Sequence, residues 1–434
     1  MKRIAIILLL NLSCLAFGQK WVSPNYDNHR LDFRDLGYPG ATEIPADHSR
    51  ISALLRPADS RYVYGATSGK QSYLFLYDPH INKVRPLGQI PDSQGVHHTL
   101  VTDDQGHLYI GTGLNLLDEI SLTRDIPGGH RQIEKALWKD IKNHHAKFTG
   151  GRIYRYTTGA ADEAVYLPED EATVEDLGLI KANNSIYALT FNPADNNIYG
   201  ITYPDADFFR LNPTTGKVDN YGPILSQKVY SGPERTWRTV PRALLCLENG
   251  DVITSGDEGR IIRFDIVEQA FEALSCAIPG EYFESWNYYG YPVVEQLIHG
   301  KGDVIWGTTS DGFLFQLDMV SESVKDMGKP RIARRVRAAT MGIDGTLYMI
   351  CGELGEPCKL VSWDTKANDG YTNWSYISVD RSPYYAKRAY QFDAMATGSD
   401  GTIFIGESDR RGKLFLFLPG GNIFEGGLNR KNPR

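Results

Sequence analysis

The sequence of 434 residues predicts an all-β fold, a seven-bladed β-propeller in a single domain. Three observations support this prediction. A short apolar motif that contains glycine recurs along the chain, each copy follows a turn rich in Asp, Asn and Gly, and helical periodicity is nearly absent. Apolar alternation bounded by such turns is typical of strands joined as hairpins. Repetition of the pattern indicates that the chain is built from similar units.

The repeated motif is expected to form the second strand of each unit. Its copies lie at 108–112, 198–202, 304–308, 347–349 and 403–406. A third strand follows at places such as 151–156, 207–211 and 313–318, and a fourth often ends in a Leu-Gly-like pair, as at 87–88, 177–178, 221–222 and 327–328. Seven units can be counted. Their innermost strands are expected to begin near Arg50, His98, Ser185, Arg242, Val293, Arg337 and Phe392.

The seventh unit reaches Phe417 with only three strands. The pattern of a fourth strand occurs at the other end of the chain, in Arg34-Asp35-Leu36-Gly37. We therefore expect an N-terminal strand to complete the last blade. Closing the ring in this way removes the exposed strand edges.

The second unit is interrupted by an insertion at about 113–149. Within it, Ile133, Leu137 and Ile141 recur at four-residue spacing, which predicts an amphipathic helix. Long insertions on a rigid scaffold often serve function. The helix is interpreted as the wall or lid of a site, and decoration of the rim is the simpler alternative.

The first residues have the pattern of an export signal. Lys2 and Arg3 precede the apolar run 4–10, and small residues at 16–18 offer a cleavage point. The sequence thus predicts a signal peptide at 1–18, a single propeller domain at 19–434 and a periplasmic location. An outer-membrane lipoprotein attached through Cys14 is the alternative.

Charge and hydropathy exclude several classes of partner. Lys and Arg total 46 against 53 Asp and Glu, and this acidic balance disfavours nucleic acid, whose partners carry clustered basic surface. No run approaches the roughly 20 apolar residues of a membrane span, so no integral membrane segment is expected after signal removal. A monomer without cofactor is expected.

Two of the four cysteines that follow the signal lie close together. Cys351 and Cys358 flank a segment with two glycines and a proline, so they could close a hairpin as a disulfide in an oxidising compartment. Two buried thiols are the equally weighted alternative.

Polar and aromatic residues gather where the innermost strands are expected to begin. Guanidinium forks bind carboxylates, and Tyr or Trp faces stack on sugar rings. This combination suits an acidic sugar, and the alternative is that these residues only line a hydrated channel. The set comprises His48, Arg50, His97, His98, Trp237, Arg238, Arg242, Tyr288, Tyr289, Tyr291, Arg334, Arg335, Arg337, Tyr390 and Gln391, with His144 and His145 from the insertion and Tyr203 after a second strand.

A two-carboxylate glycosidase mechanism finds little support in the sequence. Such enzymes need two carboxylates roughly 5 to 10 Å apart, and nothing ties Glu295 to Asp393. Histidine is the better candidate for proton transfer, because its free pKa lies near working pH. Adjacent histidines on a strand point to opposite faces, so the two His-His pairs offer no ready ligand spacing and no metal is expected.

The seven units together with Ala46-Asp47-His48-Ser49-Arg50 resemble glycoside hydrolase family 145. These exported seven-bladed propellers are described as α-L-rhamnosidases that release L-rhamnose α-1,4-linked to D-glucuronic acid. The resemblance covers essentially all of the mature chain. It implies that His48 is the main catalytic residue and that a rhamnose-capped glucuronate glycan is the substrate. Arg50, Arg334, Arg335 and Arg337 are the candidates for holding the uronate carboxylate.

That family is similar to seven-bladed ulvan lyases, which abstract a proton beside a uronate carboxylate. On this alternative, histidine and tyrosine act as base and acid and arginine neutralises the carboxylate. His98, His145, Tyr203 and Arg242 are the candidates for these roles, with His98 or Tyr203 taking the proton and Arg242 stabilising the charge on the carboxylate. A third alternative is a carbohydrate-binding propeller without catalysis. An acidic sugar is common to all three.

Overall fold

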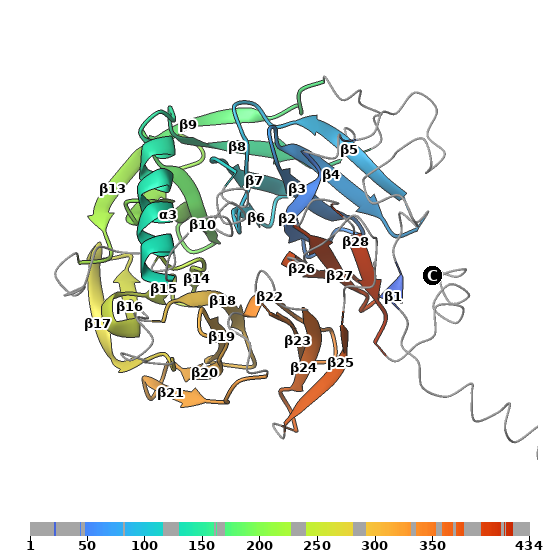
Figure 1. The fold of residues 1–434 in the computed structure, drawn as a ribbon, viewed down its shortest axis with the longest axis vertical. Helices are drawn as coiled ribbons and strands as arrows, with labels where there is room; N and C mark the ends of the chain where they lie inside the picture. Colours follow the sequence, from blue (N-terminus) through green and yellow to red (C-terminus); the bar gives the residue numbers. More distant parts are fainter. Residues whose placement is uncertain are drawn as a thin grey trace, which may run out of the picture.

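Seven four-stranded antiparallel sheets form a ring in the computed structural model (Figure 1). The predicted seven-bladed β-propeller is therefore confirmed. The structure describes residues 21–22, 44, 48–80, 83–115, 130–159, 162, 170–226, 240–280, 292–330, 336–352, 358–367, 370–376, 392–408, 412 and 414–419. The expected signal peptide at 1–18 and Cys14 lie outside these residues.

The first six blades each run from an innermost to an outermost strand in chain order, and in the seventh the outermost strand comes from the N-terminus. The first blade consists of β2 (Arg50–Leu55), β3 (Val63–Ser68), β4 (Tyr73–Asp78) and β5 (Lys83–Gln89). The second consists of β6 (Leu100–Thr102), β7 (His107–Gly111), β8 (Gly151–Thr157) and β9 (Glu175–Lys181). The third consists of β10 (Ser185–Asn192), β11 (Asn197–Tyr203), β12 (Asp207–Leu211) and β13 (Val218–Pro223).

The remaining blades continue around the ring. The fourth consists of β14 (Leu245–Cys246), β15 (Val252–Ser255), β16 (Arg260–Asp265) and β17 (Ala270–Ala277), with a 3₁₀ turn at Asp257–Gly259. The fifth consists of β18 (Val294–His299), β19 (Val304–Thr309), β20 (Leu314–Asp318) and β21 (Ser323–Asp326). The sixth consists of β22 (Val336–Met341), β23 (Thr346–Cys351), β24 (Lys359–Asp364) and β25 (Tyr371–Tyr376). The seventh consists of β26 (Phe392–Thr397), β27 (Ile403–Glu407), β28 (Leu414–Phe417) and β1 (Trp21–Val22).

The N-terminal strand completes the last blade, as predicted. β1 pairs with β28, with Trp21 opposite Phe417 and Val22 opposite Leu416. This strand is Trp21–Val22, whereas the residues expected to form it, 34–37, lie outside the described residues. The Leu-Gly pair on which that placement rested has another structural meaning. The glycines at 88, 178, 222 and 328 all have positive φ, and the first three lie where the register of the outer strand shifts. The pair is therefore typical of a β-bulge and does not identify a strand's partner.

The recurring glycine of the second strand has a packing reason. A Cβ at Gly65 would lie 2.2 Å from Cζ of Phe75, and one at Gly307 would lie 2.1 Å from Cζ of Phe315. In both blades the aromatic ring of the third strand occupies the space above the glycine. In these blades the glycine thus allows two adjacent strands of one blade to pack closely, whereas Gly111 and Gly406 face Ile186 and Ile51 of the neighbouring blade.

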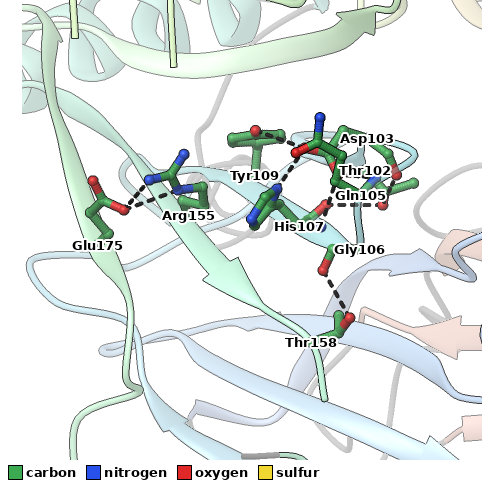
Figure 2. Close-up of polar contacts among 9 residues, drawn as sticks. All are labelled: Thr102, Asp103, Gln105, Gly106, His107, Tyr109, Arg155, Thr158 and Glu175. Atoms are coloured by element: carbon green, nitrogen blue, oxygen red, sulfur yellow. Dashed lines mark hydrogen bonds and ion pairs between the residues drawn. The ribbon is translucent and has the colours of Figure 1, made fainter. Parts of the chain in front are cut away.

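The turns that precede the second strands are held by aspartates, and Figure 2 shows the one in blade two. Asp103 accepts hydrogen bonds from the Gln105 and His107 backbone amides, from His107 Nδ1 at 2.7 Å and from the Tyr109 hydroxyl at 3.0 Å. Burial alone would raise the pKa of Asp103, but these hydrogen bonds outweigh it and lower the pKa. His107 is therefore a structural residue of the blade.

The insertion contains the predicted helix, α3 (His130–His145). It lies across blade three in Figure 1, although it is inserted in blade two. Trp138 and Ile141 are buried in a cluster with Tyr203 of β11, and the Trp138 and Tyr203 rings are 5.9 Å apart. No helix within the described ranges is both long and apolar enough to cross a bilayer.

The Cys351–Cys358 hairpin belongs to blade six. Cys351 ends β23 and Cys358 precedes β24, and both side chains are buried. The structure holds them as thiols, which corresponds to the second of the two alternatives.

Candidate functional site

The innermost strands enclose a cavity of about 180 Å³ on the propeller axis. All seven blades contribute to its wall, through the innermost strand or the segment just before it. Most of the lining side chains are apolar, but polar atoms form the larger part of the cavity surface. A small number of convergent polar groups is common in small-molecule sites. The polar lining residues are Ser52, His98, Arg242, Gln296 and Asp393.

Two arginines and two carboxylates form a buried network beside this cavity. Arg242 Nη1 lies 3.0 Å from Glu295 Oε2, and Arg242 Nη2 lies 3.7 Å from Asp393 Oδ1. Arg337 Nε donates to Asp393 Oδ1 at 2.6 Å, and the Ser408 hydroxyl donates to the other oxygen of Asp393. No pattern in the sequence relates Glu295 to Asp393, whereas in the structure Arg242 contacts both carboxylates.

The network fixes the protonation state of Asp393. Burial would raise the pKa of this carboxyl, but the charges of Arg337 and Arg242 outweigh burial and hold the pKa well below its usual range. Burial alone would lower the pKa of Arg242, but the nearby carboxylates, chiefly Glu295, outweigh burial and raise it. The cluster therefore consists of ionised partners that compensate one another.

His97 and His98 differ from the expected arrangement on a strand. Both precede β6, and His98 has φ of 51°, in the left-handed region. This backbone conformation breaks the strand alternation on which opposite side-chain directions depend. His97 donates from Nε2 to the Leu114 carbonyl at 3.2 Å, and burial lowers its pKa to about 4.

An aromatic chain connects three of the lyase-type candidates. The His145 and Tyr203 rings are 5.5 Å apart, Tyr203 stacks on Tyr187 at 4.7 Å, and the Arg242 guanidinium lies 5.9 Å from the Tyr187 ring centre. The fourth candidate, His98, lines the cavity with Arg242. The structure therefore brings these residues into one connected region.

His145 is held as a neutral base. Its Nδ1 donates to the Ile141 carbonyl at 2.8 Å, so Nε2 carries no proton and accepts from the Ser185 hydroxyl at 3.0 Å. Burial lowers the pKa of His145 to about 4. Both His145 and Tyr203 are almost fully buried, at 1% and 2% exposure.

His48 lies apart from the cavity lining, in the 3₁₀ segment before β2. It is half-buried, and its ring centre is 5.8 Å from that of Tyr73 at the start of β4. The next residue, Ser49, packs on the last blade, because a Cβ at Gly412 would lie 1.8 Å from the Ser49 carbonyl oxygen. The segment that carries His48 is thus seated between the first and last blades.

The arginines assigned to the carboxylate in the hydrolase interpretation do not form one cluster. Arg50 begins β2 and is half-buried. Arg337 is 1% exposed and engaged with Asp393, so its guanidinium has a structural partner already. Arg334 and Arg335 lie outside the described residues, as do Trp237, Arg238, Tyr288, Tyr289, Tyr291, Tyr390 and Gln391.

Sequence reasoning missed Gln296, Tyr187 and Ser408. Gln296 follows Glu295 on β18, so strand alternation alone would have directed one of the two toward the axis. Tyr187 and Ser408 carry no such signal, because their roles depend on side-chain contacts: Tyr187 meets Arg242 of the next blade, and Ser408 donates to Asp393 within its own blade. Among the described residues, no group of three or more His, Cys, Asp and Glu side chains is arranged to hold a metal ion.

Comparison with known proteins finds similarity at the level of the fold. No family model and no curated protein matches the sequence. The chain is similar to the solved extracellular domain of a putative one-component system from B. thetaiotaomicron, with TM-score 0.50 and 13% identity over 86% of this chain and 39% of that one. It is also similar to the WD40 β-propeller domain of Doa1, with TM-score 0.47 and 11% identity over 88% of this chain and 98% of that one. The first likeness, to a protein of which this chain spans well under half, supports the fold alone.

Proposed function

We propose that this protein is a glycoside hydrolase that releases terminal L-rhamnose α-1,4-linked to D-glucuronic acid, with His48 as its main catalytic residue. The residues at 46–50 and the seven-unit organisation, which resemble family 145, suggest the substrate. The observation that carries the proposal is that the two carboxylates of the innermost strands, Glu295 and Asp393, are buried and paired with arginines.

Glu295 and Asp393 are the two carboxylates that the innermost strands offer to a conventional glycosidase mechanism. Both are buried and bonded to arginines, and the pKa of Asp393 is held well below its usual range. A carboxyl in that state stays ionised at working pH and cannot donate a proton to a leaving group. Because these carboxylates are poor proton donors, histidine is the better candidate for proton transfer.

His48 has the setting that such a role needs. The segment around it is fixed by the contact of Ser49 with Gly412, and the His48 ring lies against the buried ring of Tyr73, which limits its movement. His48 would act at the glycosidic oxygen or the anomeric carbon, with help from a neighbouring hydroxyl of the substrate. Arg50, two residues away, is the candidate for the uronate carboxylate.

Elimination at a uronate is the second candidate function, and the connected region of His145, Tyr203, Tyr187 and Arg242 favours it. The unprotonated Nε2 of His145 has the state of a general base, and Arg242 could stabilise charge on a carboxylate. Burial of His145 and Tyr203 counts against it, because the substrate must reach the base.

One product assay separates these functions. The mature protein is incubated with a rhamnose-capped glucuronate oligosaccharide and, separately, with ulvan. Free rhamnose without new ultraviolet absorbance supports hydrolysis, and absorbance of an unsaturated uronate without rhamnose supports elimination. Neither product, with binding still measurable, would leave a carbohydrate-binding propeller and overturn both enzymatic proposals.

A further inference from the structure

We propose that the axial cavity is a binding site for a neutral, sugar-like ligand held by hydrogen-bond donors of His98 and Arg242, and that Gln296 positions His98 for this role. The cavity is separate from the segment that carries His48. The inference therefore does not rest on the proposed hydrolase activity.

The first observation is a pair of unsatisfied donors. Within the described part of the chain, His98 Nε2 and Arg242 Nε are both buried and have no hydrogen-bond partner. Both residues line the cavity, and the Arg242 side chain is only 5% exposed. A buried donor without an acceptor costs about 1–3 kcal/mol, and proteins satisfy nearly all such groups. A ligand in the cavity with acceptor oxygens would therefore satisfy both donors.

The second observation fixes which nitrogen of His98 carries the proton. The Gln296 amide nitrogen lies 3.1 Å from the Arg337 carbonyl oxygen and 3.1 Å from His98 Nδ1. A carbonyl can only accept, so the amide orientation is set and Gln296 donates to Nδ1 as well. Nδ1 is then an acceptor, and the proton of the neutral ring sits on Nε2.

The state of His98 agrees with a binding role. Burial, helped by the charge of Arg242, lowers the pKa of His98 well below its ordinary value, so the ring is neutral at pH 7. With its proton on Nε2, His98 offers a donor to the cavity and no base. This differs from the proton-abstracting role that the lyase alternative assigns to it.

Charge compensation indicates the class of ligand. Among the described residues, Arg242 and Arg337 are matched by Glu295 and Asp393, so these four side chains leave no net charge to attract an anion. The cavity of about 180 Å³ far exceeds the roughly 10–15 Å³ that one water requires. A monosaccharide-sized ligand whose hydroxyl or ring oxygens accept hydrogen bonds fits these conditions.

The test follows the His98 ring directly. The mature chain with His48→Ala, labelled with ¹⁵N in histidine, is titrated with L-rhamnose and, separately, with D-glucuronate while the imidazole nitrogen shifts are recorded. We expect a proton on Nε2 of His98 before titration and a shift of that resonance with L-rhamnose, at an affinity about tenfold or more above that for D-glucuronate. A proton on Nδ1, no shift with either sugar, or tighter binding of D-glucuronate would each overturn the proposal.

A matched pair of variants tests the part played by Gln296. Gln296→Glu replaces the donor with an acceptor, which should move the His98 proton to Nδ1 and weaken L-rhamnose binding about tenfold. Gln316→Glu, at a half-buried position of β20 away from the cavity lining, should change neither. Equal effects of the two variants would contradict a positioning role for Gln296. If Gln296→Glu fails to fold, the His98 tautomer in the chain with native Gln296 tests the role instead, and a proton on Nδ1 would contradict it.

Discussion

The guanidinium of Arg242 and the carboxylate of Glu295 lie 3.0 Å apart, although 53 positions separate them in the sequence. Arg242 precedes the innermost strand of blade four and Glu295 lies on that of blade five. Glu295 is fully buried and Arg242 nearly so. The pair therefore links two adjacent blades at the axis, where an unpaired charge could not be solvated.

Removing one partner of this pair should be costly. Glu295→Gln is expected to lower the free energy of unfolding by about 3–5 kcal/mol, because it leaves a buried guanidinium without its nearest carboxylate. Urea denaturation measures the change. The control is Glu272→Gln, which breaks the exposed Arg263–Glu272 pair at 2.6 Å and should cost at most about 1 kcal/mol. Similar losses in the two variants would show that burial does not govern the effect.

His48→Ala should reduce rhamnose release by about 10²–10⁴-fold, the range typical of losing a general acid or base. Substrate affinity should change little, because the proposed role is chemical. Initial rates on the rhamnose-capped oligosaccharide measure the first and calorimetric titration the second. His299→Ala, at an exposed position at the end of β18, is the matched control and should keep full activity. Full activity in His48→Ala would refute the assignment.

Gly412→Ala should displace the segment that carries His48. The added Cβ would lie 1.8 Å from the Ser49 carbonyl oxygen, and φ of 59° is itself unfavourable for alanine. The control is Gly328→Ala, since Gly328 has φ of 81° but nothing within 4 Å of the added atom. Both variants carry the backbone strain, whereas only Gly412→Ala should also lose activity. Equal rhamnose release by the two variants would show that the Ser49–Gly412 contact does not hold His48 in its active position.

The buried His145 should make stability depend on pH. Its pKa falls from 6.5 to about 4 on folding, so between these values the unfolded chain binds more protons. Stability from this residue is complete above pH 6.5, declines as the pH falls, and is lower by about 3 kcal/mol at pH 4. His145→Gln should remove this part of the slope in denaturation series at several pH values. His144→Gln, at the exposed neighbouring position, should leave the slope unchanged.

The propeller itself could be predicted because its signals are local. Strand alternation and turn aspartates recur along the chain, and a glycine lies beneath an aromatic ring of the third strand in the first, third and fifth blades. The expected starts of the innermost strands differ from the observed ones by three residues at most, the largest difference being Arg242 against Leu245. The helix of the insertion was predictable for the same reason, since four-residue spacing of apolar residues is a local signal, and Ile141 at the end of that series is buried.

The candidate site was predictable only in part. The residue types at the ring centre, His98, Arg242 and Arg337, could be named from strand starts. Their partners could not, because each lies on another blade: His98 with Gln296, Arg242 with Glu295, and Arg337 with Asp393. No periodicity relates these positions, and the left-handed backbone at His98 overrides the strand alternation that would have oriented it.

The sequence by itself therefore determined the number of blades, the closure of the ring by the N-terminus and the polar character of its centre. The blade count and the polar centre follow from local strand patterns, and the closure follows from a last unit that lacks one strand of its own. Only the tertiary structure decided which charges cancel, which nitrogen of His98 carries the proton and which donors remain for a ligand. Those outcomes depend on desolvation and on contacts between residues brought together from different blades, and both exist only once the ring has closed.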